Sequence, residues 1–143
     1  STSDIVTIHT PYNERTHHLI NKGNIGKIKK GALLINTSRG SIVDNEALIE
    51  ALDNATLAGA GLDVLEGEEY IKEEQQCLYE NCSPVQARQR EQDKNLLSRD
   101  NVVFTPHIAF YSKEALDRIL ETTKQNIIEF TLGQKENCVD CLV

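Results

Sequence analysis

Four short apolar runs recur along this chain, and each is followed by helical spacing or by a polar loop. The runs occupy residues 4–9, 32–36, 57–64 and 101–105. The second run, Ala-Leu-Leu-Ile-Asn, is almost wholly apolar, which is typical of a strand that is covered on both faces of a parallel sheet. Strands that alternate with helices need crossover connections, and these favour parallel pairing. The sequence therefore predicts an α/β fold with a parallel, doubly wound, Rossmann-like sheet.

Three segments carry helical signals of different strength. Residues 19–28 place four apolar side chains on one side of a weak helix, in which Gly23 and Gly26 each cost about 1 kcal/mol. Asp44 is the expected N-cap of a second helix, because an apolar stripe begins directly after it. Ser112 is the expected N-cap of a long helix over residues 112–132.

The segment over residues 65–100 is polar and rich in glutamate. A structureless loop of that length is unusual inside a compact domain. We therefore expect a short exposed helix within it, over residues 84–97.

The charge balance limits the classes of partner. The chain has 143 residues, with 22 Asp and Glu against 15 Lys and Arg, and a net charge of −7. An acidic chain without a basic stripe is a poor match for nucleic acid, so no nucleic-acid partner is expected. No apolar run reaches the roughly 18 residues of a transmembrane helix, and no signal peptide is visible. We expect a cytoplasmic protein without a membrane partner.

Four cysteines stand in two pairs, C-x4-C at Cys77 and Cys82 and C-x2-C at Cys138 and Cys141. Such pairs could form a four-thiolate zinc site if they met in space, or a disulfide. No cysteine-rich framework surrounds them, and one pair lies at the end of the chain. Reduced intracellular thiols are the favoured interpretation, and no metal site is expected.

Polar residues with useful chemistry follow each of the four apolar runs. In open α/β sheets, ligands bind beyond the carboxyl ends of the strands, so these residues are expected along one edge. A guanidinium there could hold an oxyanion, an imidazole could move a proton, and a carboxylate could stabilise the imidazolium. Singly, Arg39 fits a surface residue, His107 a capping residue and Asp63 an N-cap. Their joint occurrence at successive strand ends favours a site.

Four motifs make the chain resemble the D-isomer-specific 2-hydroxyacid dehydrogenases. They are DIVTIHTP at residues 4–11, KGALLINTSRG at 30–40, GLDV at 61–64 and TPHIA at 105–109. The resemblance covers nearly the whole chain in order and at compatible spacings. Glu68, five residues beyond Asp63, and the sequence His107-Ile-Ala-Phe-Tyr look most like the D-lactate dehydrogenase branch.

The resemblance implies a catalytic role for three residues. Arg39 matches the arginine that binds the carboxylate of the 2-oxo acid, a task that suits its planar fork. His107 matches the acid/base that donates a proton to the carbonyl oxygen. Glu68 matches the carboxylate that is paired with this histidine and favours its protonated form.

The resemblance also implies NAD as the cofactor. Asp63 matches the residue that holds the nicotinamide end of NAD. The other matching positions line the cofactor, and they are Thr10, Pro11, Thr16, Thr37, Ser38 and Arg39. The choice between NAD and NADP stays open, because no ribose-binding residue can be identified. A small 2-oxo or 2-hydroxy acid is the implied substrate.

The sequence also lacks parts that this family uses. No G-x-G-x-x-G turn occurs in it, and no separate substrate domain can be identified. We therefore expect residues 1–143 to be the C-terminal portion of an incomplete NAD-binding domain, with the family's C-terminal helix and without the glycine-rich loop and substrate domain. Such a fragment is expected to be inactive alone and to associate as a homo-oligomer.

Two other functions remain open at this stage. The same family includes corepressors that use NAD to control partner binding, so an NAD-responsive protein-binding module is the alternative to an enzyme. The cysteine pairs leave a weaker third interpretation, a zinc-stabilised interaction domain.

Overall fold

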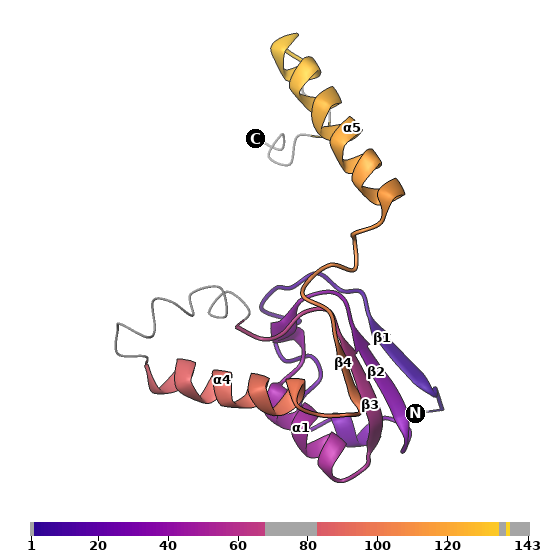
Figure 1. Ribbon diagram of the computed structural model, residues 1–143, viewed down its shortest axis with the longest axis vertical. Coiled ribbons are helices and arrows are strands. Elements are labelled where there is room, and N and C mark those ends of the chain that lie inside the picture. The colour runs from indigo at the N-terminus through magenta and orange to yellow at the C-terminus, as the bar shows by residue number, and fades with distance from the viewer. Residues whose placement is uncertain (1, 68–82, 135–136, 138–143) are drawn as a thin grey trace. The chain divides into compact units, whose positions relative to one another are not determined.

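The computed structural model describes residues 2–67, 83–134 and 137 (Figure 1). It divides the chain into two compact units, Ser1–His107 and Ile108–Val143. Glu68 and the four cysteines, Cys77, Cys82, Cys138 and Cys141, lie outside the described residues.

The first unit is built on a sheet of four parallel strands (Figure 1). The strands lie side by side in the order in which they occur in the chain, and they are β1 (Ile5–Ile8), β2 (Ala32–Asn36), β3 (Leu57–Leu62) and β4 (Val102–Phe104). Helices separate the later strands, so the predicted Rossmann-like α/β fold with a parallel sheet is confirmed.

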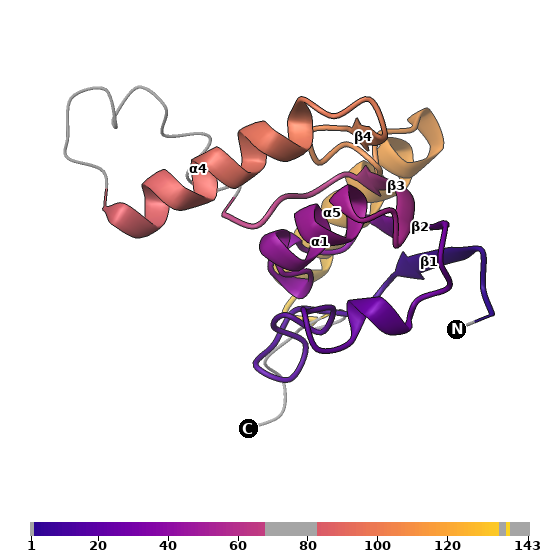
Figure 2. The same cartoon turned by 90° about the horizontal axis from the view of Figure 1, so that it is seen from below.

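Helices α1 (Asn45–Asp53) and α4 (Pro84–Leu97) pack against each other on the same side of the sheet (Figure 2). The side chain of Asp44 caps α1 by accepting hydrogen bonds from the amides of Glu46 and Ala47, as predicted. Ser83 and Gln86 form a capping box at the start of α4, which occupies the predicted residues. Local capping thus explains where both helices begin.

The core lies between this helical layer and the sheet. Leu34 and Leu62 of the strands and Leu48 of α1 are almost completely buried there, together with Leu96 of α4. Alternate strand residues point to the other side, where Leu33 and Val103 are exposed. The core therefore packs against one face of the described sheet.

The prediction of a helix over residues 19–28 is wrong. The structure has turns there and one short 3₁₀ helix, η1 (Ile25–Lys27). The side chain of Asn21 accepts a hydrogen bond from the amide of Gly23, and that of Asn24 donates to the carbonyl of Leu19 and accepts from the amide of Asn21. These bonds replace the backbone bonds of a helix, which is how asparagine competes with helical structure.

The second unit contains helix α5 (Lys113–Thr131), whose N-cap is Ser112 as predicted. The Ser112 hydroxyl accepts a hydrogen bond from the amide of Ala115 at 3.2 Å. In the part of the chain that the structure describes, no helix has both the length and the apolar character to cross a membrane.

Candidate active site

The carboxyl ends of the four strands meet at one edge of the sheet. Ile8, Asn36, Leu62 and Phe104 are register partners from β1 to β4, so they form one row across the sheet. The polar residues that follow each member of this row therefore emerge at the same edge. This edge is the place where open parallel sheets bind ligands.

The turn after β2 is shaped by the buried side chain of Asn36. Its Oδ1 accepts a hydrogen bond from the amide of Ser38 at 3.1 Å, and its Nδ2 donates to the carbonyl of Arg39 at 2.9 Å. The Ser38 hydroxyl donates to the carbonyl of Ile8 at 2.9 Å, which ties the turn to the end of β1. Thr37 and Arg39 are exposed on this turn, and one Arg39 Nη donates to the Ser38 carbonyl at 2.7 Å.

The loop after β1 is closed by a threonine. The Thr16 hydroxyl donates to the carbonyl of Pro11 and accepts from the amide of Asn13, both at 2.8 Å. The Thr10 hydroxyl oxygen is buried, and it has no hydrogen-bond partner among the described residues. Buried polar atoms are almost always paired, so Thr10 is available to a polar group of a ligand.

Asp63 and His107 are joined through the backbone. The His107 amide donates to the Asp63 carbonyl at 2.8 Å, and the Asp63 amide donates to the Asn36 carbonyl at 2.9 Å. The carboxylate of Asp63 is buried and accepts a hydrogen bond from the Thr105 hydroxyl at 2.5 Å. Three neighbouring strands are thus linked at their ends.

His107 has a left-handed backbone conformation, with a φ of 55°. This conformation is uncommon for residues other than glycine, and such residues concentrate at functional sites. The side chain is exposed at the strand-end edge. The strained backbone points to a functional constraint at this histidine.

The segment after β3 approaches the turn after β2 at Gly40. A Cβ atom on Gly40 would lie 2.0 Å from the carbonyl group of Leu65 and 2.2 Å from the amide nitrogen of Glu66. Only glycine permits two backbones to come so close. Glu66 is therefore held next to the residue that follows Arg39, and the chain then leads to Glu68 beyond the described part.

The structure thus brings several of the predicted site residues to one edge. These are Thr10, Pro11, Thr37, Ser38, Arg39, Asp63 and His107, with Thr16 in the loop beyond β1. Within the described part, the only hydrogen bond from the Arg39 side chain goes to Ser38. The pairing of Glu68 with His107 stays a prediction.

Two features were missed by the sequence reasoning. Asp93 of α4 is buried and hydrogen-bonded to Asn45 and Gln89, and burial raises its pKa to about 6.

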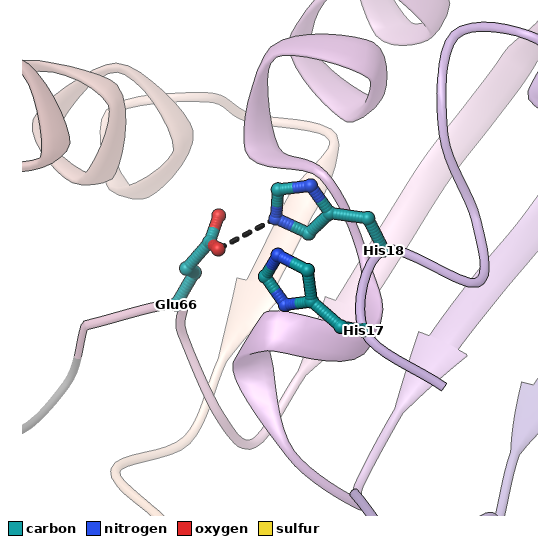
Figure 3. Close-up of side chains that lie close together, drawn as sticks. All are labelled: His17, His18 and Glu66. Atoms are coloured by element: carbon teal, nitrogen blue, oxygen red, sulfur yellow. Dashed lines mark hydrogen bonds and ion pairs between the residues drawn. The ribbon is translucent and has the colours of Figure 1, made fainter. Parts of the chain in front are cut away.

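The second feature is a cluster of side chains, in which His17 and His18 lie close to Glu66 (Figure 3). The His-His pair is visible in the sequence, but the carboxylate partner of His18 is 48 residues away and could not be identified without the fold.

A groove of about 670 Å³ between α1 and α4 is separate from these strand ends. Lys22 lies 3.3 Å from a carboxylate oxygen of Glu46 and 3.7 Å from one of Glu50, and Arg88 also pairs with Glu46. The groove is lined by four acidic and two basic side chains and by none of the predicted site residues, so it is not the candidate site.

Comparison with known proteins identifies the family. Residues 1–109 match the D-isomer specific 2-hydroxyacid dehydrogenase, NAD binding domain. The chain is 42% identical over 137 residues to a D-specific alpha-keto acid dehydrogenase of Enterococcus faecium, which covers 93% of this chain and 39% of that protein. It is 36% identical over 120 residues to a D-lactate dehydrogenase of Treponema pallidum, covering 84% of this chain and 34% of the relative.

Solved structures give the same result. The D-lactate dehydrogenase of Aquifex aeolicus, crystallised with NAD and lactic acid, aligns with a TM-score of 0.80 and 37% identity. The alignment covers 94% of this chain and 39% of that one. The chain therefore spans about two fifths of the length of these relatives, and it belongs to the D-isomer specific 2-hydroxyacid dehydrogenases, within their NAD binding domain.

Proposed function

We propose that this chain is part of an NAD-dependent oxidoreductase that reduces a 2-oxo acid to a D-2-hydroxy acid. One observation carries the proposal. The neighbouring strands β2, β3 and β4 deliver Arg39, Asp63 and His107 to a single edge, where the last two are joined by a hydrogen bond. The family membership supplies the reaction class for that arrangement.

Residues 1–143 form the C-terminal portion of the NAD-binding domain in this proposal, and they work within a longer polypeptide. Two facts support this. The chain spans 39% of the Enterococcus relative and 39% of the Aquifex structure. Its sequence also contains no G-x-G-x-x-G turn, although this turn holds the pyrophosphate in dinucleotide-binding domains.

The strand-end edge fits NAD. The buried Thr10 hydroxyl, which has no partner among the described residues, offers a polar contact to the cofactor, and the buried Asp63 carboxyl group, held by Thr105, offers acceptor oxygens at the nicotinamide end. Thr10, Pro11, Thr16, Thr37, Ser38 and Arg39 line the same side. When bound, NADH supplies the hydride that the carbonyl carbon accepts.

The protein's own residues bind the substrate and move the proton. Arg39 binds the carboxylate of the 2-oxo acid through two parallel N–H···O hydrogen bonds and so fixes the orientation of the carbonyl group. His107 donates a proton from its imidazolium to the carbonyl oxygen, which becomes the hydroxyl of the product. Glu68 stabilises that imidazolium with its negative charge.

Pyruvate is the substrate that we propose first. The spacing of Glu68 and the sequence Phe110-Tyr111 resemble the D-lactate dehydrogenase branch, and pyruvate is the 2-oxo acid that gives D-lactate. Other relatives carry the names aromatic 2-oxoacid reductase and glyoxylate reductase. Aromatic 2-oxo acids and glyoxylate are therefore the substrates to compare with pyruvate.

The test is a turnover assay on the longer protein that contains this chain. The loss of NADH absorbance is followed with pyruvate, glyoxylate or an aromatic 2-oxo acid, and NADPH replaces NADH in a parallel series. We expect turnover with at least one 2-oxo acid and a D-configured product. NADH binding without turnover of any of these acids would favour the NAD-responsive protein-binding alternative.

We further propose that the protein assembles as a homo-oligomer. β1 and β4 are the edge strands of the described sheet, and Val103 of β4 is 69% exposed. Unpaired strand edges, and apolar side chains exposed on the open face of a sheet, both favour association with another chain. Light scattering on the purified protein tests this, and a monomeric mass at high concentration would contradict it.

A further inference from the structure

Two adjacent histidines and a glutamate converge on one point beside the candidate site. His17 and His18 follow the loop after β1, and Glu66 follows β3 (Figure 3). One ligand atom from each of the three side chains lies within 4.8 Å of the others. We propose that His17, His18 and Glu66 form a binding site for a divalent transition-metal ion such as Zn²⁺.

The type of ligand selects the class of ion. Two imidazole nitrogens and one carboxylate oxygen are the donors that zinc and its neighbours in the first transition row prefer. Calcium and magnesium prefer sites built only from oxygen. Three protein ligands also leave a coordination position for water, as in open zinc sites rather than closed structural ones.

Glu66 and His18 are held in place before any ion binds. The close approach at Gly40 fixes the backbone of Glu66. The His18 amide donates to the Ser41 carbonyl at 2.9 Å, and its carbonyl accepts from the Asn21 side chain at 2.8 Å. His18 also has a left-handed backbone with a φ of 47°, which the surrounding structure must maintain.

His17 is oriented by Tyr12. The Tyr12 hydroxyl lies 3.4 Å from Nδ1 of His17, and the two rings meet edge to face. When Nδ1 carries the proton and donates to the tyrosine oxygen, the lone pair is on Nε2. Metal-binding histidines commonly have such a partner on the second ring nitrogen.

An ion would replace an existing hydrogen bond. Nε2 of His18 lies 2.6 Å from a carboxylate oxygen of Glu66, and an ionised carboxylate can only accept, so this nitrogen carries the proton. On metal binding that proton moves to Nδ1 or leaves to solvent, and the lone pair of Nε2 binds the ion. The rings of His17 and His18 are stacked with centroids 4.0 Å apart, so their planes would tilt toward each other when both Nε2 atoms bind one ion, and Nδ1 of His17 would keep its contact with Tyr12.

The bound ion would connect two segments of the candidate site. The loop with His17 and His18 also carries Thr16, and Glu66 lies two residues before Glu68. Metal binding itself does not depend on the proposed dehydrogenase function, so the two proposals can fail separately.

The experiment measures Zn²⁺ affinity of the full chain by competition with a chromogenic chelator. All cysteines are first alkylated, so that Cys77, Cys82, Cys138 and Cys141 cannot bind the metal. We expect one Zn²⁺ per chain. Loss of a hydrogen-bond partner of a metal ligand weakens metal binding by about 10–100-fold, so loss of a ligand itself, in His17→Gln or Glu66→Gln, should weaken it by at least about 100-fold.

The matched control is His9→Gln, which removes an exposed histidine outside the cluster. It should keep wild-type affinity. His18→Asn is the third ligand variant, because asparagine tolerates the left-handed backbone at that position. If His18→Asn does not fold, the exposed His17 variant still decides the question.

Co²⁺ provides a spectroscopic check on the ligands. The alkylated wild type should show the visible bands of a low-symmetry Co²⁺ site without thiolate charge transfer, and His17→Gln should lose them. The proposal is overturned if the alkylated wild type binds no Zn²⁺, if it binds no more tightly than His17→Gln, or if His9→Gln loses affinity to the same extent.

Discussion

The backbone amide of His107 donates a hydrogen bond to the carbonyl oxygen of Asp63 over 2.8 Å. The proposed proton donor and the proposed nicotinamide contact are therefore fixed relative to each other by the main chain. A side-chain substitution at either position leaves this bond in place. The chemistry of each side chain can thus be tested without removing the link between the two strand ends.

Replacement of His107 should remove most of the turnover. General acid catalysis is typically worth about 10²–10⁴-fold, so His107→Gln in the longer protein should lower kcat by a factor in that range. Because the backbone is left-handed at this position, His107→Asn serves as a second variant that tolerates the conformation. Near-normal kcat in both variants at their optimal pH would remove His107 from the mechanism.

Arg39→Lys keeps the positive charge but loses the planar fork. A hydrogen bond to a charged group contributes about 1.5–3 kcal/mol, so kcat/KM for the 2-oxo acid should fall by about 10–100-fold. Arg88→Lys is the control, because Arg88 lies on α4 in the groove and pairs with Glu46. Equal kinetic constants for wild type and Arg39→Lys would contradict the carboxylate-binding role.

Gly40→Ala should destabilise the fold. The new methyl group would lie 2.0 Å from the Leu65 carbonyl group, and backbone atoms cannot move away as a flexible side chain can. Overpacking typically costs about 1–3 kcal/mol and occasionally more, so we expect a loss of about 3 kcal/mol in the free energy of unfolding. Gly26→Ala is the matched control, since no atom lies within 4 Å of its added Cβ. Denaturant unfolding compares the two, and equal midpoints would contradict the close approach.

Asp93 should make the stability depend on pH. Burial raises its pKa from 3.8 to about 6, and the hydrogen bonds from Gln89 and Asn45 offset only part of this shift. The folded state therefore holds the proton more tightly than the unfolded state. The stability that this carboxyl contributes is fully present below pH 3.8 and is lost as the pH rises through about 6.

Asp93→Asn isolates that effect. Asparagine keeps an oxygen for both hydrogen bonds and has no charge to desolvate, so the variant should be more stable than wild type at pH 7, by up to about 3 kcal/mol at about 1.4 kcal/mol per pKa unit. The difference between the two proteins should vanish toward pH 4. Thermal unfolding between pH 4 and pH 7 measures the stability of both proteins. A stability difference that does not change with pH would contradict the raised pKa of Asp93.

The 143-residue chain on its own should bind NADH weakly. Its sequence has no G-x-G-x-x-G turn, and backbone amides of that turn hold the pyrophosphate. Titration followed by cofactor fluorescence checks this. Micromolar binding together with reduction of pyruvate would show that these residues form a complete enzyme.

Much of the fold could be predicted from local patterns. β2 was predicted with its observed ends, because an apolar run bounded by a glycine turn and polar residues has few alternatives. The helix Pro84–Leu97 followed from its position in an otherwise overlong polar segment. Residues 19–28 could not be predicted correctly, because asparagine side chains replaced the helical hydrogen bonds there.

The candidate site was predicted from residues that each follow their own strand. The structure brings Arg39, Asp63 and His107 to one edge, because parallel strands share one carboxyl edge, while their roles stay a prediction. The contact between His18 and Glu66 was not predictable, since it depends on how closely the backbone at Gly40 approaches the segment after β3. The raised pKa of Asp93 likewise arises from packing of α4 against α1.

The strands lie across the sheet in the same order as along the chain, and this has a consequence for folding. Each described strand after β1 pairs with the strand that precedes it, so no pairing within the described sheet waits for a segment that is synthesised later. During synthesis each strand can add to the sheet that is already present. His107 is then the last of the proposed site residues to leave the ribosome, so the turns that we propose to line the cofactor can form before the proposed proton donor is synthesised.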